Sequence, residues 1–303
     1  MNQWKRKCTL IVTSSGGSGI DLSQFKITFF IKKTDAQSPN EAEIKVYNLA
    51  QNTVNQIQKE FTRVTLQAGY EENFAVIFDG NIKQVKFGRD NGTDSYITIL
   101  AGDGDSAYNF AVVNKTLSAG SSQSDQANAA IDSMDGVSAG DVQIDGKAKL
   151  TRGKVMYGMA RDYLRQTADT ENAAWSIQDG KAQIIPISRL ASGTAVVLNS
   201  KTGLVGTPEQ TNDGITVKAL LNPQIKIGGA LKIDEADIKT ATIQTKTSTQ
   251  KDDKVNTPAT IAHDGAYKVI SVEYVGDNRG NDWYANIVAI DIDETVKQVQ
   301  GGK

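Results

Sequence analysis

The chain has 303 residues, of which 39% are hydrophobic and 22% are charged, a composition typical of a folded globular protein and not of a disordered one. Its 33 Lys and Arg residues and 35 Asp and Glu residues give a net charge of −2, which removes the main electrostatic reason to expect a nucleic-acid-binding protein. A single cysteine, Cys8, and a single histidine, His263, exclude an intramolecular disulfide and a His/Cys zinc site. Much of enzymatic catalysis is therefore disfavoured, since any Ser-His-Asp triad or Cys-His pair would need His263.

No membrane or export segment is predicted. The longest apolar run, Phe74–Phe78, has five residues, whereas a bilayer-spanning helix needs roughly 18 to 20. The basic residues 5–7 precede only a short apolar stretch, which ends in the polar residues 13–17, too soon for a signal peptide. We therefore expect synthesis in a reducing cytosol and, if the protein leaves, a route other than secretion.

Residues 1–102 alternate apolar and polar side chains, which predicts strands. The predicted strands are 25–31, 42–47, 64–68, 74–87 and 96–100. Gly80 inside the fourth strand predicts a bulge or a sharp bend, as a closing barrel requires. Val54 and Ile57 lie at helical spacing within 49–59 and predict a short surface helix. Many short strands separated by turn sequences favour a small barrel or sandwich.

The composition changes after Gly102, and the middle of the chain predicts an α+β unit. A helix is expected near Ser124–Met134, and the strongest helix is expected over Gly153–Ala168. The apolar stripe of this second helix consists of Met156, Met159, Ala160, Tyr163, Leu164 and Thr167. Residues 175–185 predict a hairpin with Asp179-Gly180 at its turn.

From Thr194 onward the strand pattern returns. The predicted strands are 214–221, 231–233, 267–275 and 283–292, and the last two flank a polar hairpin tip, Gly276–Asn281. Residues 239–260 contain almost no apolar residue after Ile243. We expect them to be the most mobile internal segment.

The charged and glycine-rich motifs predict no ligand site. Gly16–Gly19 lacks the Gly-Lys-Ser/Thr ending of a phosphate loop and predicts a turn. The pairs Asp103/Asp105 and Asp291/Asp293 lack the twelve-residue loop of a calcium site. We expect the first pair to cap the following helix or turn and the second to lie on a solvated strand face.

The aromatic and histidine residues also predict structure. His263 lies in a turn sequence, and Trp4, Trp175 and Trp283 are expected in the core or at an interface. Only a cluster of exposed tryptophans would indicate sugar binding. We predict no catalytic, cofactor-binding or metal-binding residue, and no cofactor.

Several strings of residues resemble one family. Pro39–Leu49, with the sequence Pro-Asn-Glu-Ala-Glu-Ile-Lys-Val-Tyr-Asn-Leu, resembles a segment of phage tail hub proteins and related baseplate proteins. Further blocks match in the same order along nearly the whole chain, at 102–120, 152–177, 202–223 and 276–283. The chain thus resembles the baseplate hub proteins of contractile phage tails, which carry the central spike.

The resemblance implies a mainly β protein with two tail-tube-like β-barrel domains flanking a small α+β domain. The expected domains are residues 1–102, residues 103–189, and residues 190–303, which include the segment 239–260. Three copies would form a ring of six similar barrels that joins a six-fold tail tube to a three-fold spike. The family is structural, so no catalytic residue carries over. Lys26, Thr28 and Lys32 are predicted to line the channel of the ring.

The implied partners are two further copies of the chain, the central spike protein, a tail tube or tube-initiator protein, other baseplate proteins and a tape measure protein. The implied location is the baseplate of the virion tail, assembled in the host cytoplasm. Two alternatives stay open. A carbohydrate-binding tail protein has only the tryptophans and the loop 276–282 in its favour, and a cell-wall hydrolase is opposed by the missing His/Cys chemistry.

Overall fold

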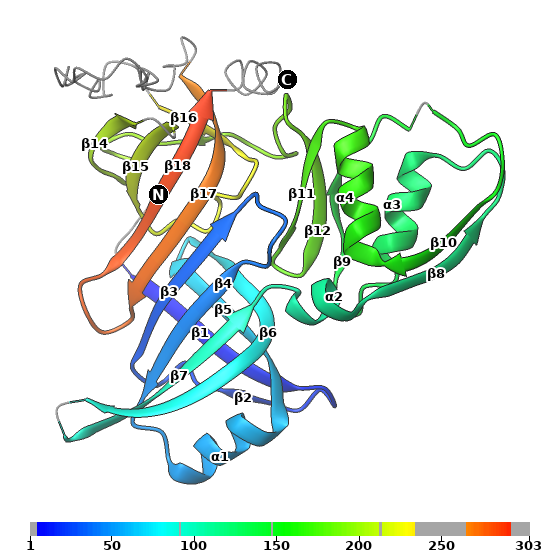
Figure 1. Ribbon diagram of the computed structural model, residues 1–303. Coiled ribbons are helices and arrows are strands. Elements are labelled where there is room, and N and C mark those ends of the chain that lie inside the picture. The colour runs from blue at the N-terminus through cyan, green and yellow to red at the C-terminus, as the bar shows by residue number, and fades with distance from the viewer. Residues whose placement is uncertain (1–4, 91, 147, 212–213, 234–264, 292–303) are drawn as a thin grey trace, which may run out of the picture.

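The computed structural model describes residues 5–90, 92–146, 148–211, 214–233 and 265–291, and the structural statements below concern these residues (Figure 1). The predictions for Trp4, His263, Asp293 and residues 239–260 lie outside them.

One large sheet joins strands from both ends of the chain. Its strands are β1 Arg6–Ser14, β2 Gly19–Asp21, β3 Ile27–Thr34, β4 Glu41–Tyr47, β5 Phe61–Tyr70, β6 Asn73–Asp90, β7 Asp94–Gly102, β13 Val196–Val197, β14 Leu204–Thr211, β15 Gly214–Leu220, β16 Ala230–Lys232, β17 Ala266–Asp277 and β18 Trp283–Asp291. The order across the sheet is β14-β15-β18-β17-β3-β4-β7-β6-β5-β1-β2, and β16 pairs with both β17 and β13. We call the described strands of residues 5–102 the N-terminal section and those of residues 194–291 the C-terminal section. The strands of both sections therefore belong to one sheet.

The alternation of apolar residues correctly predicts which face of each strand is buried. Ile27, Phe29 and Ile31 of β3 lie in the core, while Phe30 and Lys32 point outward. β4 and β5 bury alternate residues in the same way. This follows because successive side chains of a strand point to opposite faces of the sheet. The strand predictions for the N-terminal section are thereby confirmed.

The short surface helix is also confirmed, as α1 Gln51–Glu60, which buries Val54 and Ile57 against the sheet. The bulge expected at Gly80 is misplaced. The register of β6 shifts on either side of this residue, near Ile77 and Lys83. Gly80 itself allows close approach of two strands, since a Cβ atom there would lie 2.5 Å from the carbonyl oxygen of Gly102.

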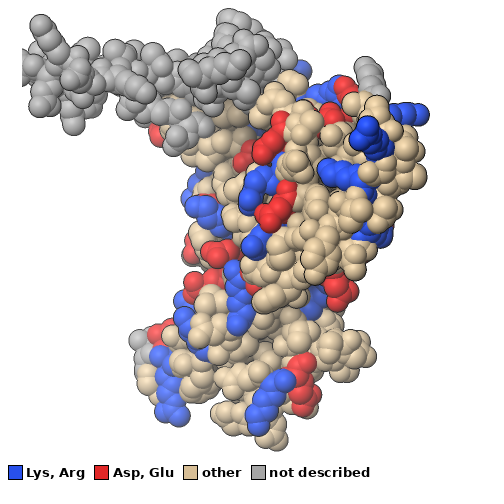
Figure 2. All heavy atoms as spheres, turned by 45° about the vertical axis from the view of Figure 1, so that its right-hand side comes forward, with Lys and Arg blue, Asp and Glu red and all other residues tan. Residues whose placement is uncertain are grey.

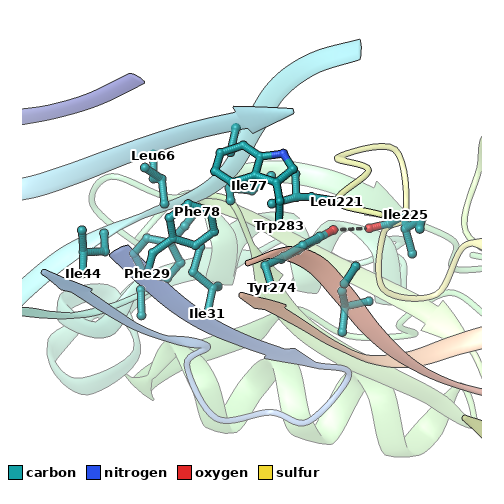
Figure 3. Close-up of a cluster of buried hydrophobic side chains, with 14 of the residues drawn as sticks. Phe29, Ile31, Ile44, Leu66, Ile77, Phe78, Leu221, Ile225, Tyr274 and Trp283 are labelled. Carbon is teal, nitrogen blue, oxygen red and sulfur yellow. Dashed lines mark hydrogen bonds between the residues drawn. The ribbon is translucent and has the colours of Figure 1, made fainter. Parts of the chain in front are cut away.

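A single hydrophobic core lies beneath the N-terminal and C-terminal sections (Figure 3). The rings of Phe29 and Trp283 meet edge to face with centroids 5.6 Å apart, a favoured aromatic geometry. The buried hydroxyl of Tyr274 donates a hydrogen bond of 2.6 Å to the carbonyl oxygen of Ile225. Trp283 is fully buried, as is Trp175 elsewhere, so the expectation that these two tryptophans are core residues is confirmed.

Residues 105–186 form a separate α+β unit, here the middle unit, on the right in Figure 1. Its elements are α2 Asp105–Phe110, β8 Val112–Leu117, α3 Gln123–Ile131, β9 Ser138–Val142, β10 Lys154–Met159, α4 Ala160–Thr170, β11 Ala173–Gln178 and β12 Lys181–Pro186. β8 pairs with β10, and β9, β11 and β12 form a three-stranded sheet. A second hydrophobic cluster, which includes Met156, Leu164 and Trp175, fills the space between these sheets and the helices.

The helix expected over Gly153–Ala168 is wrong in its first half. Residues 154–159 form strand β10, and the helix begins only at Ala160. Met156 is a buried residue of the strand and Leu164 a buried residue of the helix. Their separation of eight residues also fits one face of a helix, so the sequence resembles one continuous apolar stripe. Gly158 has a φ of 154°, which no helix accommodates, and pairing with β8 keeps the preceding residues extended.

The other two elements predicted for the middle unit are confirmed. α3 begins with a capping box in which Ser122 and Asp125 bond each other's backbone N–H groups. The β11–β12 hairpin turns at Asp179 and Gly180, whose φ values are 54° and 73°. Such a turn of two left-handed residues favours the Asp-Gly sequence. The three-domain division stays a prediction beside these observations.

Candidate assembly surfaces

The pairing of β17 with β3, here the seam, joins the N-terminal and C-terminal sections. The two strands run antiparallel from the Ser271–Thr34 pair to the Asp277–Thr28 pair. Side chains on the inner face of the seam belong to the core. On the outer face, Phe30 lies between β17 and β4, next to Val275 and Glu43.

Opposite charges face each other across the outer face of the seam. Lys32 lies 3.5 Å from Glu273 and Lys26 lies 3.9 Å from Asp277. Exposed pairs of this kind contribute only about 0–1 kcal/mol each. A hollow of about 210 Å³ opens beside Phe30. Lys32 and Phe30 point outward from the sheet and Thr28 is half-buried, so the residues predicted to line a channel share a face that also carries an exposed aromatic ring.

The hairpin tip that joins β17 to β18 is tied to the N-terminal section. The amide of Asn278 accepts from the backbone N–H of Ile27 at 2.9 Å and donates to the carbonyl of Phe25 at 2.8 Å. Arg6 donates to the carbonyl of Gly280 at 2.7 Å. These side-chain groups reinforce the seam instead of facing a ligand.

Asp103 anchors the middle unit, which corrects the expectation that it caps the following helix. Its buried carboxylate accepts hydrogen bonds from the backbone N–H groups of Asp179 and Gly180, at the turn of the β11–β12 hairpin. The N-cap of α2 is instead Gly104, and Asp105 forms an ion pair of 3.2 Å with Lys83. Burial raises the pKa of Asp103 to about 7, although nearby Lys33 and the two N–H groups oppose this shift.

Further polar side chains of the N-terminal section hold the same hairpin. The ammonium group of Lys33, which is only 6% exposed, pairs with the carboxylate of Asp179. The amide of Asn40 donates to the carbonyl of Ile177 and to the side chain of Gln178, each at 2.9 Å. The name hairpin clamp is used below for Lys33, Asn40 and Asp103 together with Gln178, Asp179 and Gly180.

Sequence reasoning missed the hairpin clamp. Lys33 continues the buried series Ile27, Phe29 and Ile31, but no local pattern shows that its partner is Asp179, 146 residues away. Asn40 follows Pro39 and reads as a turn residue. Two signals were available: the lysine on the buried side of an alternating strand, and the closely spaced acidic pair that begins at Asp103, for which capping was the wrong interpretation.

Within the described residues, no three His, Cys, Asp or Glu side chains gather as a metal site. Burial raises the pKa of the Cys8 thiol to about 12, so this thiol is a weak nucleophile at neutral pH. No helix in the described ranges is both long and apolar enough to cross a membrane. The turn predicted at Gly16–Gly19 is confirmed as the connection between β1 and β2.

The fold is similar to those of solved phage tail proteins. The 43 kDa tail protein of prophage MuSo2 from Shewanella oneidensis matches with a TM-score of 0.58 at 9% identity, covering 95% of this chain and 98% of that one. A tail protein from Neisseria meningitidis gives 0.58 at 7% identity, covering 95% and 97%.

A third similar structure is an Escherichia coli component of the type VI secretion system, described as similar to the T4 bacteriophage tail proteins gp27 and gp5. It matches with a TM-score of 0.50 at 8% identity, covering 95% of this chain and 76% of that one. None of the curated proteins compared with the chain matches it.

The sequence itself matches a family model described as baseplate hub gp41 over residues 7–238. This range includes the N-terminal section, the middle unit and the beginning of the C-terminal section. It agrees with the resemblance found at Pro39–Leu49 and the later blocks. The chain therefore belongs to the baseplate hub gp41 family, a family of structural phage tail proteins.

Proposed function

We propose that the chain assembles as a homotrimeric ring in the baseplate of a contractile tail, between a six-fold tail tube and a three-fold central spike. The observation that carries this proposal is the seam. It joins two strand-rich sections in one sheet, so three copies would supply six sections around a three-fold axis. In this proposal each section is a tail-tube-like barrel domain, and the domains are residues 1–102, 103–189 and 190–303.

The ends of the sheet support assembly into a closed ring. Among the described strands, β14 and β2 lie at the two ends of the main order. Strand edges carry backbone groups that must be covered, guarded or paired. A head-to-tail contact between different surfaces of neighbouring copies closes into a ring when the rotation allows it. Three-fold closure would cover part of these edges.

The outer face of the seam supports a channel wall. Its lysine and glutamate side chains pair with one another around the exposed Phe30, so the face carries little net charge. Such a wall would let a chain or nucleic acid pass without binding it tightly. In the proposal, Lys26, Thr28 and Lys32 line this channel.

The proposed partners are a spike protein, a tube or tube-initiator protein, other baseplate proteins and a tape measure protein. Support for a spike partner comes from the similarity to the secretion-system component, whose own description mentions T4 tail proteins. Membership of a baseplate family implies the virion tail as the location. Assembly would take place in the host cytoplasm, and the protein would have no enzymatic activity.

The ring can be tested by the accessibility of its channel. Lys32→Cys places a reactive thiol on the outer face of the seam, and Gln58→Cys on α1 is the matched control, because both positions are exposed. The half-buried Cys8 contributes little background, because burial raises the pKa of its thiol to about 12. In the isolated chain, a large polyethylene-glycol maleimide should label both variants. In assembled tails, it should label only the control, whereas a small maleimide still reaches both.

Equal labelling of both variants by the large reagent in assembled tails would contradict the channel. A direct image of the baseplate tests the symmetry, and a two-fold dimer of this chain there would remove the basis of the proposal. Glycan-array binding and zymography on bacterial walls test the carbohydrate-binding and hydrolase alternatives. No described residue favours either, since Trp175 and Trp283 are buried and the tip at Asn278 is tied down.

A further inference from the structure

The β8–β10 ribbon of the middle unit has one face with several exposed apolar side chains that no described element covers. Its inner face buries Val113 and Met156 in the second hydrophobic cluster. The other face carries Val112, Val155 and Tyr157, which are 49%, 70% and 74% exposed. Phe110, two residues before β8, is 77% exposed. These four residues, here the ribbon patch, are four of the seven large hydrophobic side chains that the described structure exposes.

The backbone of β8 is available on its outer edge. In an antiparallel pair, hydrogen-bonded and non-hydrogen-bonded residue pairs alternate. The backbone N–H of Ala160 bonds the carbonyl of Ala111, while the N–H of Tyr157 points away from β8 and donates to the hydroxyl of Tyr163 at 2.9 Å. The alternation therefore turns the backbone groups of residues 112, 114 and 116 outward from β8, where the described residues offer them no partner.

The two edges of the ribbon thus differ. The edge of β10 is closed in part by the Tyr163 hydroxyl, whereas that of β8 is open. Natural edge strands are usually guarded by charged side chains, prolines or bulges. β8 contains no proline and its ladder has an unbroken register, and its one charged residue, Lys115, is engaged in an ion pair of 3.0 Å with Asp132. By contrast, β14 carries Pro208 and a shifted register.

The size of the ribbon patch indicates its occupant. The two aromatic side chains together expose roughly 300 Å², taking about 200 Å² for a whole aromatic side chain. A stable interface between two folded proteins buries about 800 Å² on each partner. These exposed side chains are therefore too small an area for a stable interface with a second folded chain, whereas a single added strand is held by the outward backbone groups of β8.

Charge indicates one end of that strand. The outward side chains of β8, at Val112, Asn114 and Thr116, are uncharged. Next to the Leu117 end of the ribbon, Lys149 and Arg152 are exposed, and Lys149 also interacts with the carboxylate of Asp125. Figure 2 shows uncharged surface over much of the middle unit, with both basic and acidic side chains around it. A strand bound here gains from an acidic residue near Leu117.

We propose that β8 accepts an extended segment of another polypeptide, which adds a third strand to the ribbon. The segment carries uncharged residues, apolar at alternate positions, and an acidic residue at the Leu117 end. Backbone hydrogen bonds to residues 112, 114 and 116 supply affinity, and the apolar side chains of the added strand lie beside Val112, whereas Val155 and Tyr157 on β10 are one strand farther away. This proposal holds whether or not the chain forms a trimeric ring.

The test uses a peptide of eight alternating Val and Thr residues preceded by two Glu residues, added to the full chain. We expect binding and slower amide hydrogen exchange at residues 112, 114 and 116. Asn114→Pro removes one outward donor without removing a hydrogen bond to β10, and it should weaken binding about tenfold, as the loss of one good hydrogen bond implies. Val112→Ser, on β8 itself, should weaken binding as well. Val197→Ser, at a valine with the same exposed fraction of 49%, is the matched control and should leave binding unchanged.

Thermal unfolding must first show that the three variants fold like the parent chain. No binding of the peptide to the parent chain would overturn the proposal, and so would binding that Asn114→Pro does not weaken. Light scattering provides another decisive outcome. A dimer of the chain that Asn114→Pro abolishes would show that a second copy covers β8, which would also overturn the proposal.

Discussion

The seam and the hairpin clamp both join distant parts of the chain, but they do so by different physical means. The seam uses a ladder of backbone hydrogen bonds above a shared apolar core. The hairpin clamp uses side chains, several of them charged and buried. Backbone pairing and apolar burial change little with pH, whereas charged groups titrate. The two joints should therefore respond differently to mutation, pH and salt.

The largest expected effect is at the core below the seam. Trp283→Ala removes a fully buried ring that packs against Phe29, so it should lower the free energy of unfolding by about 3–5 kcal/mol. Denaturant unfolding measures this loss. Phe30→Ala on the outer face of the same sheet is the control and should cost less than about 1 kcal/mol. Equal losses would show that the two faces of β3 are assigned wrongly.

A smaller effect is expected at the hairpin clamp. Asp103→Ala leaves the N–H groups of Asp179 and Gly180 without their acceptor, at a cost of about 1–3 kcal/mol. Amide exchange should accelerate at this turn and leave β17 and β3 unchanged. Asp105→Ala, which removes an ion pair outside the hairpin clamp, should leave exchange at the turn unaltered. Faster exchange throughout the seam would mean that the two joints are not separable.

The stability contributed by the hairpin clamp should depend on pH, unlike that of the seam. Burial raises the pKa of Asp103 from 3.8 to about 7, so between these values the folded chain binds more protons than the unfolded chain. Stability from this group is fully present below about pH 4 and is lost as the pH rises through 7. The destabilisation caused by Asp103→Ala should therefore be larger at pH 5 than at pH 8. Unfolding curves of both proteins at the two pH values measure the difference, and a larger cost at pH 8 would refute the raised pKa.

The smallest effect concerns the surface charges of the seam. Lys32→Ala removes an exposed ion pair with Glu273 and should cost no more than about 1 kcal/mol. The difference from the parent chain should shrink in 1 M salt, where the Debye length falls to about 3 Å. Denaturant unfolding at low and high salt measures it. A salt-independent loss would point to packing of the lysine stem instead of charge.

Local patterns in the sequence were enough to predict the strand faces and the hairpin turn. Ile27, Phe29 and Ile31 alternate with polar residues, and Asp179-Gly180 has the residue types that a left-handed turn requires. Both signals act over a few residues, so they can be read without knowledge of the rest of the fold. The baseplate resemblance was likewise carried by contiguous strings such as Pro39–Leu49.

The joints could not be predicted in this way. The Asp277–Thr28 pair links opposite ends of the chain, and no local pattern specifies which strand edges meet. Asp103 and Gly180 are likewise far apart in sequence, and only the tertiary fold brings them within hydrogen-bond distance. The start of α4 was missed for a different reason, because Met156 satisfies both a strand period and a helical period.

The antiparallel geometry of the seam also determines how the molecule carries mechanical load. Hydrogen bonds between β17 and β3 run across the strands, so tension along the strands shears the whole set at once. The hairpin clamp holds one turn through a few side chains, which tension can break one after another. A force that pulls the middle unit away from the sheet should thus detach this unit first, while the two strand-rich sections stay joined and move as one body.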